Sequence, residues 1–336
     1  MNSNSTRQFN RLTFIDDGRF VKKTSSYVSK FIDEINWLVT LPKQLKKYIP
    51  TIKDYKIDGK NSYIVYHFIK WDTLHCKFIQ SKPLYRWTKI AEMYSKLLKD
   101  FKKIKPNKFD KEYWTKQFIN MYLIKTINRL KDLNNDNKFR LFFNTKNILI
   151  NGIEYPSITS IIKWLENILI TYIETGEWKS KYFHNICTSV ANNVCFFHGD
   201  LCFSNVFVNC KEKKIICIDP RASFGEDKKY GDLLFDFAKI YESASGLYDF
   251  VIEDKFSVKI NSKSFNYKIN ISKNAMSCQK AFEKIWPKKY LLEIKLIEAL
   301  QFLCMIPFHA DHYKRQLVFL AHGIVRFYNI IKQEWK

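Results

Sequence analysis

The chain has 336 residues, more than one typical hydrophobic core uses, so two lobes or domains are expected. Hydrophobic residues make up 46% of the sequence and aromatic residues 16%, which excludes a disordered chain. Glycine and proline number only 9 and 8, so flexible linkers between separate domains are not expected.

The formal net charge of +23 is compatible with nucleic acid, an anionic membrane surface or a polyphosphate substrate. The lysines are spread over the whole length, and runs such as 43–47 and 99–105 are short and interrupted. This distribution favours a general compositional bias over a nucleic-acid face, and leaves peripheral association with a membrane open. No signal region and no long apolar stretch is present, so we expect no transmembrane segment and a cytoplasmic protein.

Eight cysteines occur without a C-x-x-C pair or a histidine at zinc-finger spacing. The five between Cys187 and Cys217 fall in apolar, strand-like segments. We interpret them as reduced thiols of the core, and a cysteine metal site is not expected.

The first 75 residues predict a small β-rich lobe with one helix. Residues 11–24 are typical of a hairpin with its turn at Asp16–Gly18. The apolar spacing from Ser25 to Leu41 predicts a helix that Pro42 ends, and Tyr63–Phe68 has strand composition. We therefore place an N-terminal nucleotide-binding lobe at 1–75.

Residues 76–336 predict a larger, mainly helical lobe. Helical stripes are predicted for Trp87–Phe101, Asp110–Leu133, Ile158–Thr175, Cys278–Ile285, Tyr290–Cys304 and Tyr313–Gln333. The exception is Val194–Asp219, where short strands bracket a polar loop. We assign this lobe catalysis and acceptor binding.

The strongest chemical signal is Phe197–Asn205 (FHGDLCFSN), followed by two strands that end at Ile218–Arg221 (IDPR). Phosphoryl transfer needs a base at the attacking hydroxyl and metal ions at the phosphates. Asp200 fits the base, since a loop carboxylate can accept the hydroxyl proton. Asn205 and Asp219 offer the oxygen ligands that Mg²⁺ prefers.

The H-G-D motif, the later Asn and the I-D-P-R segment together resemble the aminoglycoside phosphotransferase and choline kinase family of protein-kinase-like enzymes. The resemblance implies that Asp200 is the catalytic base, that Asn205 and Asp219 bind magnesium, and that His198 supports the backbone of the loop. It also implies that Asp236 fastens this loop from a helix.

More narrowly, Ile218–Ser243 and Met305–Gln316 resemble a bacterial subgroup associated with capsule or surface-polysaccharide biosynthesis. Met305–Gln316 clusters His309, Asp311, His312 and Arg315 in an expected loop. This loop is a candidate for contact with the acceptor, and a helix cap with solvated charges is the alternative.

Arg221 is a candidate for binding phosphate, because guanidinium is a planar partner for phosphoryl oxygens, and a structural ion pair is the alternative. Kinases of this fold also need a strand lysine tied to a helix glutamate. The V-x-K pattern of the family favours Lys23, with Lys22 as the alternative. Glu34 lies at the edge of the apolar helical stripe, whereas Asp33 falls nearly opposite the stripe, so Glu34 is the better partner for the lysine; a solvated glutamate is the alternative.

A glycine-rich phosphate loop is missing, because Gly18 and Gly59 are the only glycines in the first 150 residues. We expect the turn Asp16–Gly18 to cradle the phosphates instead. Tyr66–Lys70 is expected to link the lobes and to hydrogen-bond the purine through its main chain.

The sequence therefore predicts an α+β, bilobal protein-kinase-like fold. The predicted enzyme is a phosphotransferase that moves the γ-phosphoryl group of ATP or GTP, with Mg²⁺, to a hydroxyl of a sugar, amino alcohol or polysaccharide precursor. The alternative is a pseudokinase-like nucleotide-binding or scaffold protein in surface-polysaccharide biosynthesis.

Overall fold

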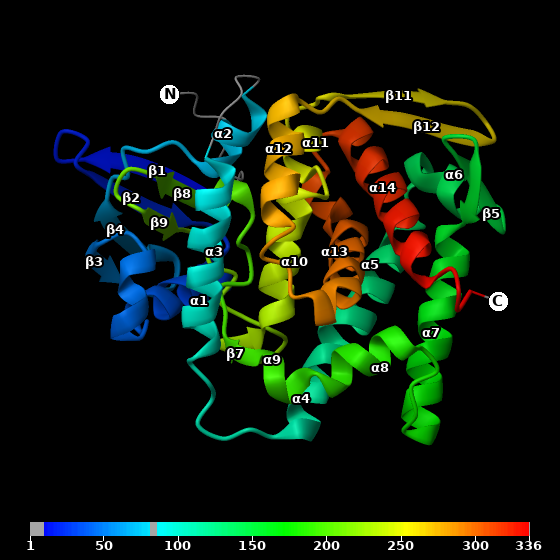
Figure 1. Ribbon diagram of the computed structural model, residues 1–336, viewed down its shortest axis with the longest axis horizontal. Helices are drawn as coiled ribbons and strands as arrows, with labels where there is room; N and C mark the ends of the chain where they lie inside the picture. Colours follow the sequence, from blue (N-terminus) through cyan, green and yellow to red (C-terminus); the bar gives the residue numbers. More distant parts are fainter. Residues whose placement is uncertain (1–9, 81–85, 336) are drawn as a thin grey trace.

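A four-stranded antiparallel sheet and one long helix form the N-terminal lobe of the computed structural model, which describes residues 10–80 and 86–335 (Figure 1). The strands are β1 (Asn10–Ile15), β2 (Phe20–Ser25), β3 (Ile52–Lys56) and β4 (Tyr63–His67), in the order β1-β2-β4-β3. The tight turn between β1 and β2 has positive φ at Asp16, Asp17 and Gly18. The composition of the first ten residues predicts a loose N-terminal end; residues 1–9 lie outside the described residues, and Asn10 begins β1.

Helix α1 (Val28–Val39) follows β2, as the apolar spacing predicts. Its buried side chains are Phe31, Ile35, Trp37 and Leu38. Short 3₁₀ turns η2 (Lys43–Tyr48) and η3 (Gly59–Asn61) flank β3. Strand β4 extends to His67, so Tyr66 and His67 still belong to the sheet and the linker to the second lobe begins after them.

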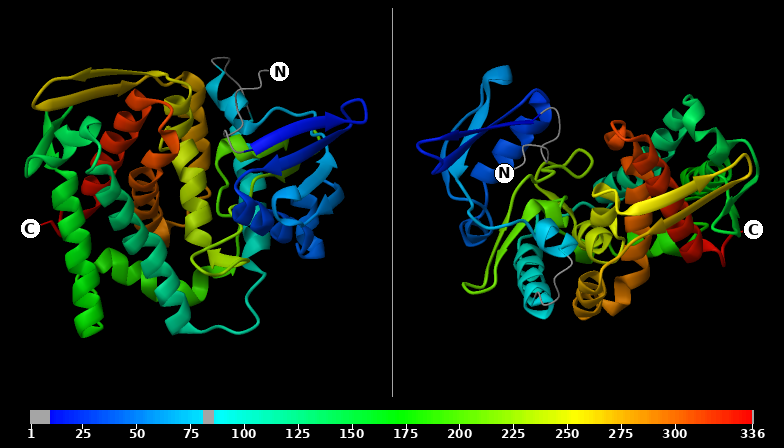
Figure 2. Two further views of the ribbon diagram at one scale, coloured as in Figure 1. Left: turned by 180° about the vertical axis from the view of Figure 1, so that it is seen from behind. Right: turned by 90° about the horizontal axis from the view of Figure 1, so that it is seen from above.

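The second lobe is mainly helical, and Figure 2 shows its helices gathered on one side of the molecule with the N-terminal sheet on the other. The helices before the strand-bearing loop segment are α2 (Leu74–Ile79), α3 (Trp87–Lys102), α4 (Lys111–Phe118), η4 (Ile119–Ile124, a π-helical turn), α5 (Lys125–Leu133), η5 (Asn137–Phe139), α6 (Arg140–Phe143), α7 (Ile158–Thr175), α8 (Lys181–Thr188) and α9 (Val190–Asn193). Those after it are α10 (Leu233–Ala244), α11 (Tyr248–Ile252), α12 (Lys273–Phe282), η7 (Lys288–Tyr290), α13 (Leu291–Met305), η8 (Ile306–His309) and α14 (Tyr313–Ile331).

Short strands surround the polar loop at 197–205, as expected. Strand β7 (Val194–Phe196) pairs with β10 (Tyr230–Asp232), while β8 (Val206–Asn209) pairs with β9 (Lys214–Cys217). The one-turn 3₁₀ helix η6 (Phe203–Asn205) closes the loop. These two small β-ladders fix the positions of the loop 197–205 and of the segment 218–221 that follows β9.

A further sheet in the helical lobe corrects the expectation that 194–219 is its only β segment. Strands β5 (Asn147–Ile150), β6 (Ile153–Pro156), β11 (Phe256–Ile260) and β12 (Ser264–Ile269) form it in the order β11-β12-β5-β6. The β5–β6 turn is Asn151-Gly152, both with positive φ. Asn-Gly between apolar residues is a strong hairpin signal, so this turn was predictable, whereas the parallel β12–β5 pairing joins segments more than 100 residues apart.

Two buried clusters form the core. One lies within the helical lobe and contains residues of η4, α5, α7, α13 and α14. The other joins the lobes, since it contains Ile35 of α1 and Phe203 of η6 with much of α3. The N-terminal sheet and the loop segments therefore share one apolar core, and the division into domains at residue 75 stays a prediction.

All eight cysteines are free thiols, and four of the five between Cys187 and Cys217 are buried, with Cys210 partly exposed. Within 10–80 and 86–335, no helix has both the length and the apolar character needed to cross a bilayer.

Candidate active site

Lys23 on β2 lies where the sheet meets the second lobe. Its ammonium Nζ donates to both carboxylate oxygens of Glu34 on α1, at 2.8 and 2.9 Å. It also donates to Asp219 Oδ1 at 2.7 Å. Lys23 is only 2% exposed. One buried ammonium therefore joins a strand, a helix and the segment after β9.

The pKa values of this cluster follow from its charges. Burial lowers the pKa of Lys23, but the carboxylates of Asp219 and Glu34 outweigh it and raise the value well above the ordinary one. Burial raises the pKa of Glu34, and the charge of Asp219 adds to this, while Lys23 opposes both. Two carboxylates share one cation here, so a further cation would be stabilised.

The neighbouring candidates face elsewhere. Lys22, the alternative to Lys23, points to the other face of the sheet, where its ammonium lies 4.2 Å from the centroid of the Tyr63 ring. Asp33 pairs with Lys228 at 2.7 Å. The strand and helix periodicities therefore separate the two lysines and the two acids in the way that the sequence analysis expected.

The loop Phe197–Asn205, here called the HGD loop, is held in place by hydrogen bonds to Asp236 of α10. Asp236 accepts hydrogen bonds from the backbone amides of His198 at 2.9 Å and Gly199 at 2.7 Å. Asp236 is fully buried, and burial raises its pKa to about 7, although the two amides oppose this. The side chain acts on the loop backbone, as the resemblance implies for it.

His198 is also a structural element of the loop. Its Nδ1 accepts the backbone amide of Asp200 at 3.2 Å. Burial lowers the pKa of His198 to about 4, so the ring is neutral near pH 7. Gly199 has φ +80°, and a Cβ there would lie 2.7 Å from Cβ of Arg221. The loop thus needs glycine at this position.

Asp200 projects from the HGD loop with both carboxylate oxygens engaged. Asn205 Nδ2 donates to Asp200 Oδ2 at 2.9 Å and to its backbone carbonyl at 3.0 Å. Lys239 Nζ of α10 lies 3.1 Å from Asp200 Oδ1. The amide group of Asn205 is oriented by these bonds, so its Oδ1 points away from Asp200.

Lys239 is a site residue that was not predicted from the sequence. Its ammonium also binds Glu242 Oε1 at 2.8 Å, and Glu242 is fully buried. The signal was the spacing of Asp236, Lys239 and Glu242, which places three charged residues on one face of an otherwise apolar helix. Charged residues on a helix face that packs against a core are rare unless they are paired, so such a face is a candidate for a functional role.

Asp219 follows β9 with φ 55°, in the left-handed region that is unusual for a residue other than glycine. Arg221 is tied to the HGD loop, because its amide donates to the carbonyl of His198 at 2.8 Å. Its Nε donates to the carbonyl of Ser223 at 3.0 Å. The two loops therefore lie side by side and bring Asp219 and Arg221 beside the segment that carries Asp200.

The turn Asp16–Gly18, which was expected to cradle the phosphates, does not lie beside Lys23. It adjoins the end of β4, since the amide of Phe68 donates to the carbonyl of Arg19 at 2.9 Å. Lys23 lies three residues beyond the start of β2, about 10 Å farther along the strand. Asp16 pairs with Arg19 instead. The hairpin register puts this turn at the wrong end of the strand for the Lys23 cluster.

The segment Met305–Gln316 is divided by the start of α14. His312 caps this helix, accepting the amide of Arg315 at its Nδ1, and Arg315 pairs with Asp254. His309 turns the other way, with its ring 4.8 Å from Phe319 and 6.1 Å from Tyr248. The cap interpretation therefore describes His312 and Arg315, while His309 belongs to an aromatic group.

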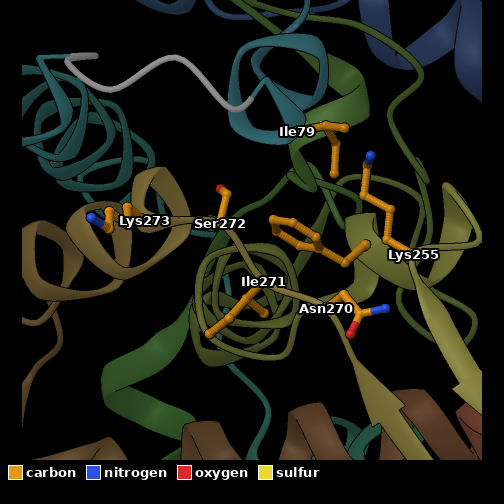
Figure 3. A pocket seen from close by; sticks show the side chains of 7 residues that line it. Ile79, Lys255, Asn270, Ile271, Ser272 and Lys273 are labelled. Carbon is orange, nitrogen blue, oxygen red and sulfur yellow. The ribbon is translucent and has the colours of Figure 1, made fainter.

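A cavity of about 390 Å³ lies apart from these residues, between the end of α2, the start of α12 and the segment before β11. Figure 3 shows the side chains of Ile79, Lys255, Asn270 and Ser272 around it. None of the residues described above lines it. A much smaller hollow is lined by Glu34, Tyr66 and Asp219, where the sheet meets the second lobe.

Asn205 and Asp219 suit a magnesium ion that is also bound by phosphates and water better than a metal ion bound by protein side chains alone. Among the described residues, no three His, Cys, Asp or Glu side chains gather in a way that could hold a metal ion. Mg²⁺ is commonly bound by one or two protein ligands together with phosphates and water. Asp219, with 39% of its side chain exposed, and Asn205, through its amide oxygen, are the side chains that could supply such ligands.

The sequence matches no protein-family model and no curated protein. Several solved structures are similar to the chain. The gentamicin complex of APH(2'')-IIa is 13% identical with a TM-score of 0.45, covering 95% of this chain and 91% of that one. A putative fructosamine-3-kinase from Haemophilus somnus is 13% identical with a TM-score of 0.47, covering 98% and 89%.

Spectinomycin phosphotransferase APH(9)-Ia, in complex with ADP and spectinomycin, is 12% identical with a TM-score of 0.39, covering 97% of this chain and 92% of that one. All three TM-scores lie below 0.5.

Proposed function

We propose that this chain is a small-molecule kinase that transfers the γ-phosphoryl group of ATP or GTP to a hydroxyl group. The observation that carries the proposal is the contact between Lys23 Nζ and Asp219 Oδ1 at 2.7 Å. It brings the cation of the sheet lobe against the acid that follows β9. Kinases need both groups to bind a nucleoside triphosphate: a lysine that contacts the phosphates and a carboxylate that holds the metal ion.

In this proposal Lys23 contacts the α- and β-phosphates, and Glu34 holds its ammonium in place. Asn205 and Asp219 would hold Mg²⁺, which neutralises charge on the β- and γ-phosphates when bound. Asp236 and His198 fix the backbone of the HGD loop, through the bonds described above, so that Asp200 has a defined position.

The transfer itself requires one base. Asp200 accepts the proton of the acceptor hydroxyl, whose oxygen forms a bond to the γ-phosphorus. The bond from this phosphorus to the bridging oxygen breaks, and the nucleoside diphosphate leaves with that oxygen. The 3.1 Å contact with Lys239 favours an ionised Asp200, which is the form that accepts a proton.

A sugar, an amino alcohol or a polysaccharide precursor is the acceptor class that we infer. The resemblance of Ile218–Ser243 to the polysaccharide-associated subgroup supports this class. A pseudokinase would not need the full set of Lys23, Asp200 and Asp219, so we favour turnover.

The test is release of ADP from ATP by the full chain, with and without Mg²⁺, against a panel of sugars and amino alcohols. Asp200→Asn should reduce acceptor-stimulated turnover by at least 1,000-fold and leave nucleotide binding intact, because only the proton acceptor is lost. Asp16→Asn, an exposed acid in the β1–β2 turn, is the matched control and should retain full turnover. Nucleotide binding without turnover in the wild type would favour the pseudokinase.

A further inference from the structure

Cationic side chains from two segments, α5 and the loop after Asp219, act electrostatically on one another and on Lys239, which touches Asp200. Lys125 and Arg129 lie one turn apart on α5, so they share a face of that helix. Arg221 comes from the loop after Asp219, and its guanidinium lies 5.9 Å from the ring of Phe235. The ring of Phe235 stacks on that of Tyr122 at 6.3 Å, one turn before Lys125. We call Lys125, Arg129 and Arg221 the cationic cluster.

The two cations on α5, Lys125 and Arg129, carry charge that no carboxylate of the described part of the chain neutralises. Within residues 10–80 and 86–335, neither Lys125 nor Arg129 has an ion pair with a carboxylate. Arg129 donates to the carbonyl of Cys304 at 2.8 Å, and its guanidinium lies 4.6 Å from the exposed ring of Phe308. Lys125 is only partly exposed. Partly buried cations without carboxylates favour an anionic partner.

Electrostatics supports the same conclusion. Burial lowers the pKa of Lys125, and the positive charges of Arg221, Arg129 and Lys239 lower it further, while Cys304 acts in the opposite direction. Burial lowers the pKa of Lys30, and the positive charge of Arg221 lowers it further. Like charges that repel one another are stabilised when an anion binds among them.

The cluster is linked to the base through Lys239. Lys239, which touches Asp200, is one of the charges that act on Lys125. Arg129 is bonded to the end of α13 and belongs wholly to the helical lobe, whereas Lys23 belongs to the sheet. The half-buried ring of Tyr248 lies 5.8 Å from Lys239 Nζ and offers an apolar face near the base.

We propose that the acceptor carries a phosphate or carboxylate group besides its reacting hydroxyl, and that Lys125, Arg129 and Arg221 bind this anionic group. The inference rests on the proposed kinase function, which it narrows to acidic acceptors such as sugar phosphates or sugar acids. Binding of the anionic group at the cluster would hold the hydroxyl at Asp200, so the charge would select the substrate and position it.

The first experiment measures binding and does not need turnover. Calorimetric titration of the full chain, saturated with magnesium and a non-hydrolysable ATP analogue, compares glucose with glucose 1-phosphate and galactose with galacturonate. We expect at least one acidic member to bind about 10-fold or more tightly than its neutral partner, since hydrogen bonds to charged groups are the strong ones. Equal binding within both pairs would overturn the proposal.

The second experiment assigns the effect to the cluster. Lys125→Gln should weaken binding of the acidic sugar about 10-fold and leave binding of the ATP analogue unchanged. Lys131→Gln is the matched control, because this lysine lies on the same helix and pairs with Glu166 at 2.6 Å. Weaker binding of the nucleotide, with the acidic sugar unaffected, would assign the cluster to the donor and overturn the inference.

Turnover separates this inference from the proposed function. Release of ADP with neutral acceptors as efficient as with acidic ones would leave the kinase function standing and contradict the acidic acceptor. Selective binding of an acidic sugar that depends on Lys125, without any release of ADP, would contradict the kinase function and retain the anion site.

Discussion

Trp37 on α1 donates a hydrogen bond from its indole Nε1 to the carbonyl of Phe197 at 3.0 Å, which joins the helix that carries Glu34 to the first residue of the HGD loop. The same indole meets the ring of His198 edge to face, with centroids 5.5 Å apart. Glu34 lies one helical turn before Trp37. The position of Glu34, and through it that of Lys23, is therefore coupled to the loop that carries Asp200.

Trp37→Phe should lower kcat about 10-fold, because α1 loses its polar tie to the HGD loop, and should lower the free energy of unfolding by about 1 kcal/mol. Steady-state kinetics and urea unfolding measure the two effects. Trp87→Phe is the control for the loss of a buried indole hydrogen bond, since its Nε1 donates to Asn274 at 2.7 Å and a phenylalanine ring can keep the stacking on Phe203. It should cost similar stability and keep kcat; an equal loss of kcat in both variants would contradict the coupling.

Gly199→Ala should lower the free energy of unfolding by about 2 to 3 kcal/mol and abolish most turnover. The new Cβ adopts a strained φ and lies 2.7 Å from Cβ of Arg221, so the HGD loop must shift. Gly176→Ala tests the strain alone, because Gly176 has φ +73° with open space around it. That variant should cost about 1 kcal/mol and leave kcat unchanged. Similar costs at the two positions would show that the contact with Arg221 is relieved easily.

Lys239→Met should lower the free energy of unfolding by about 3 kcal/mol, because Glu242 would remain buried without its cation. Changing Glu242 to Met as well should recover at least half of this loss, because the uncompensated charge is removed. Urea unfolding of both variants measures the difference. A double variant less stable than the single one would mean that the ion pair itself, and not the unpaired acid, dominates the effect.

Asp232→Asn should change how stability depends on pH. Burial raises the pKa of Asp232 from 3.8 to about 7, although the hydroxyl of Tyr122 and the amide of Leu234 donate to it. The folded state then holds the proton more tightly than the unfolded state, so the free energy of unfolding falls as the pH rises from about 4 to about 7. Asparagine cannot ionise and removes this fall.

The measurement is urea unfolding of the wild type and Asp232→Asn between pH 5 and pH 7. The stability of the variant relative to the wild type should increase by about 1 kcal/mol per pH unit over this range and then level off. The other buried acids are present in both proteins and cancel in the difference. Parallel curves would mean that Asp232 is already ionised at pH 5.

The sequence by itself determined the local chemistry of this protein. Period-2 alternation on β2 separates Lys22 from Lys23, and the helical period of α1 separates Asp33 from Glu34. Both patterns depend on short-range backbone geometry, which the residues encode directly. The H-G-D motif and the helix with Asp236 could likewise be predicted from the sequence, because each is a contiguous segment with a distinctive pattern of residues.

Only the tertiary structure decided which distant residues meet. Lys23 reaches Asp219 across 196 positions of the chain, and Lys239 reaches Asp200 because α10 packs beneath the HGD loop. The turn sequence does not determine where the turn lies relative to Lys23. The pairing of β1 with β2 puts Asp16–Gly18 at the end of β2 that is distant from Lys23. Long-range contacts of this kind depend on the packing of whole elements, so the cationic cluster of α5 and Arg221 had no signal in any single stretch of sequence.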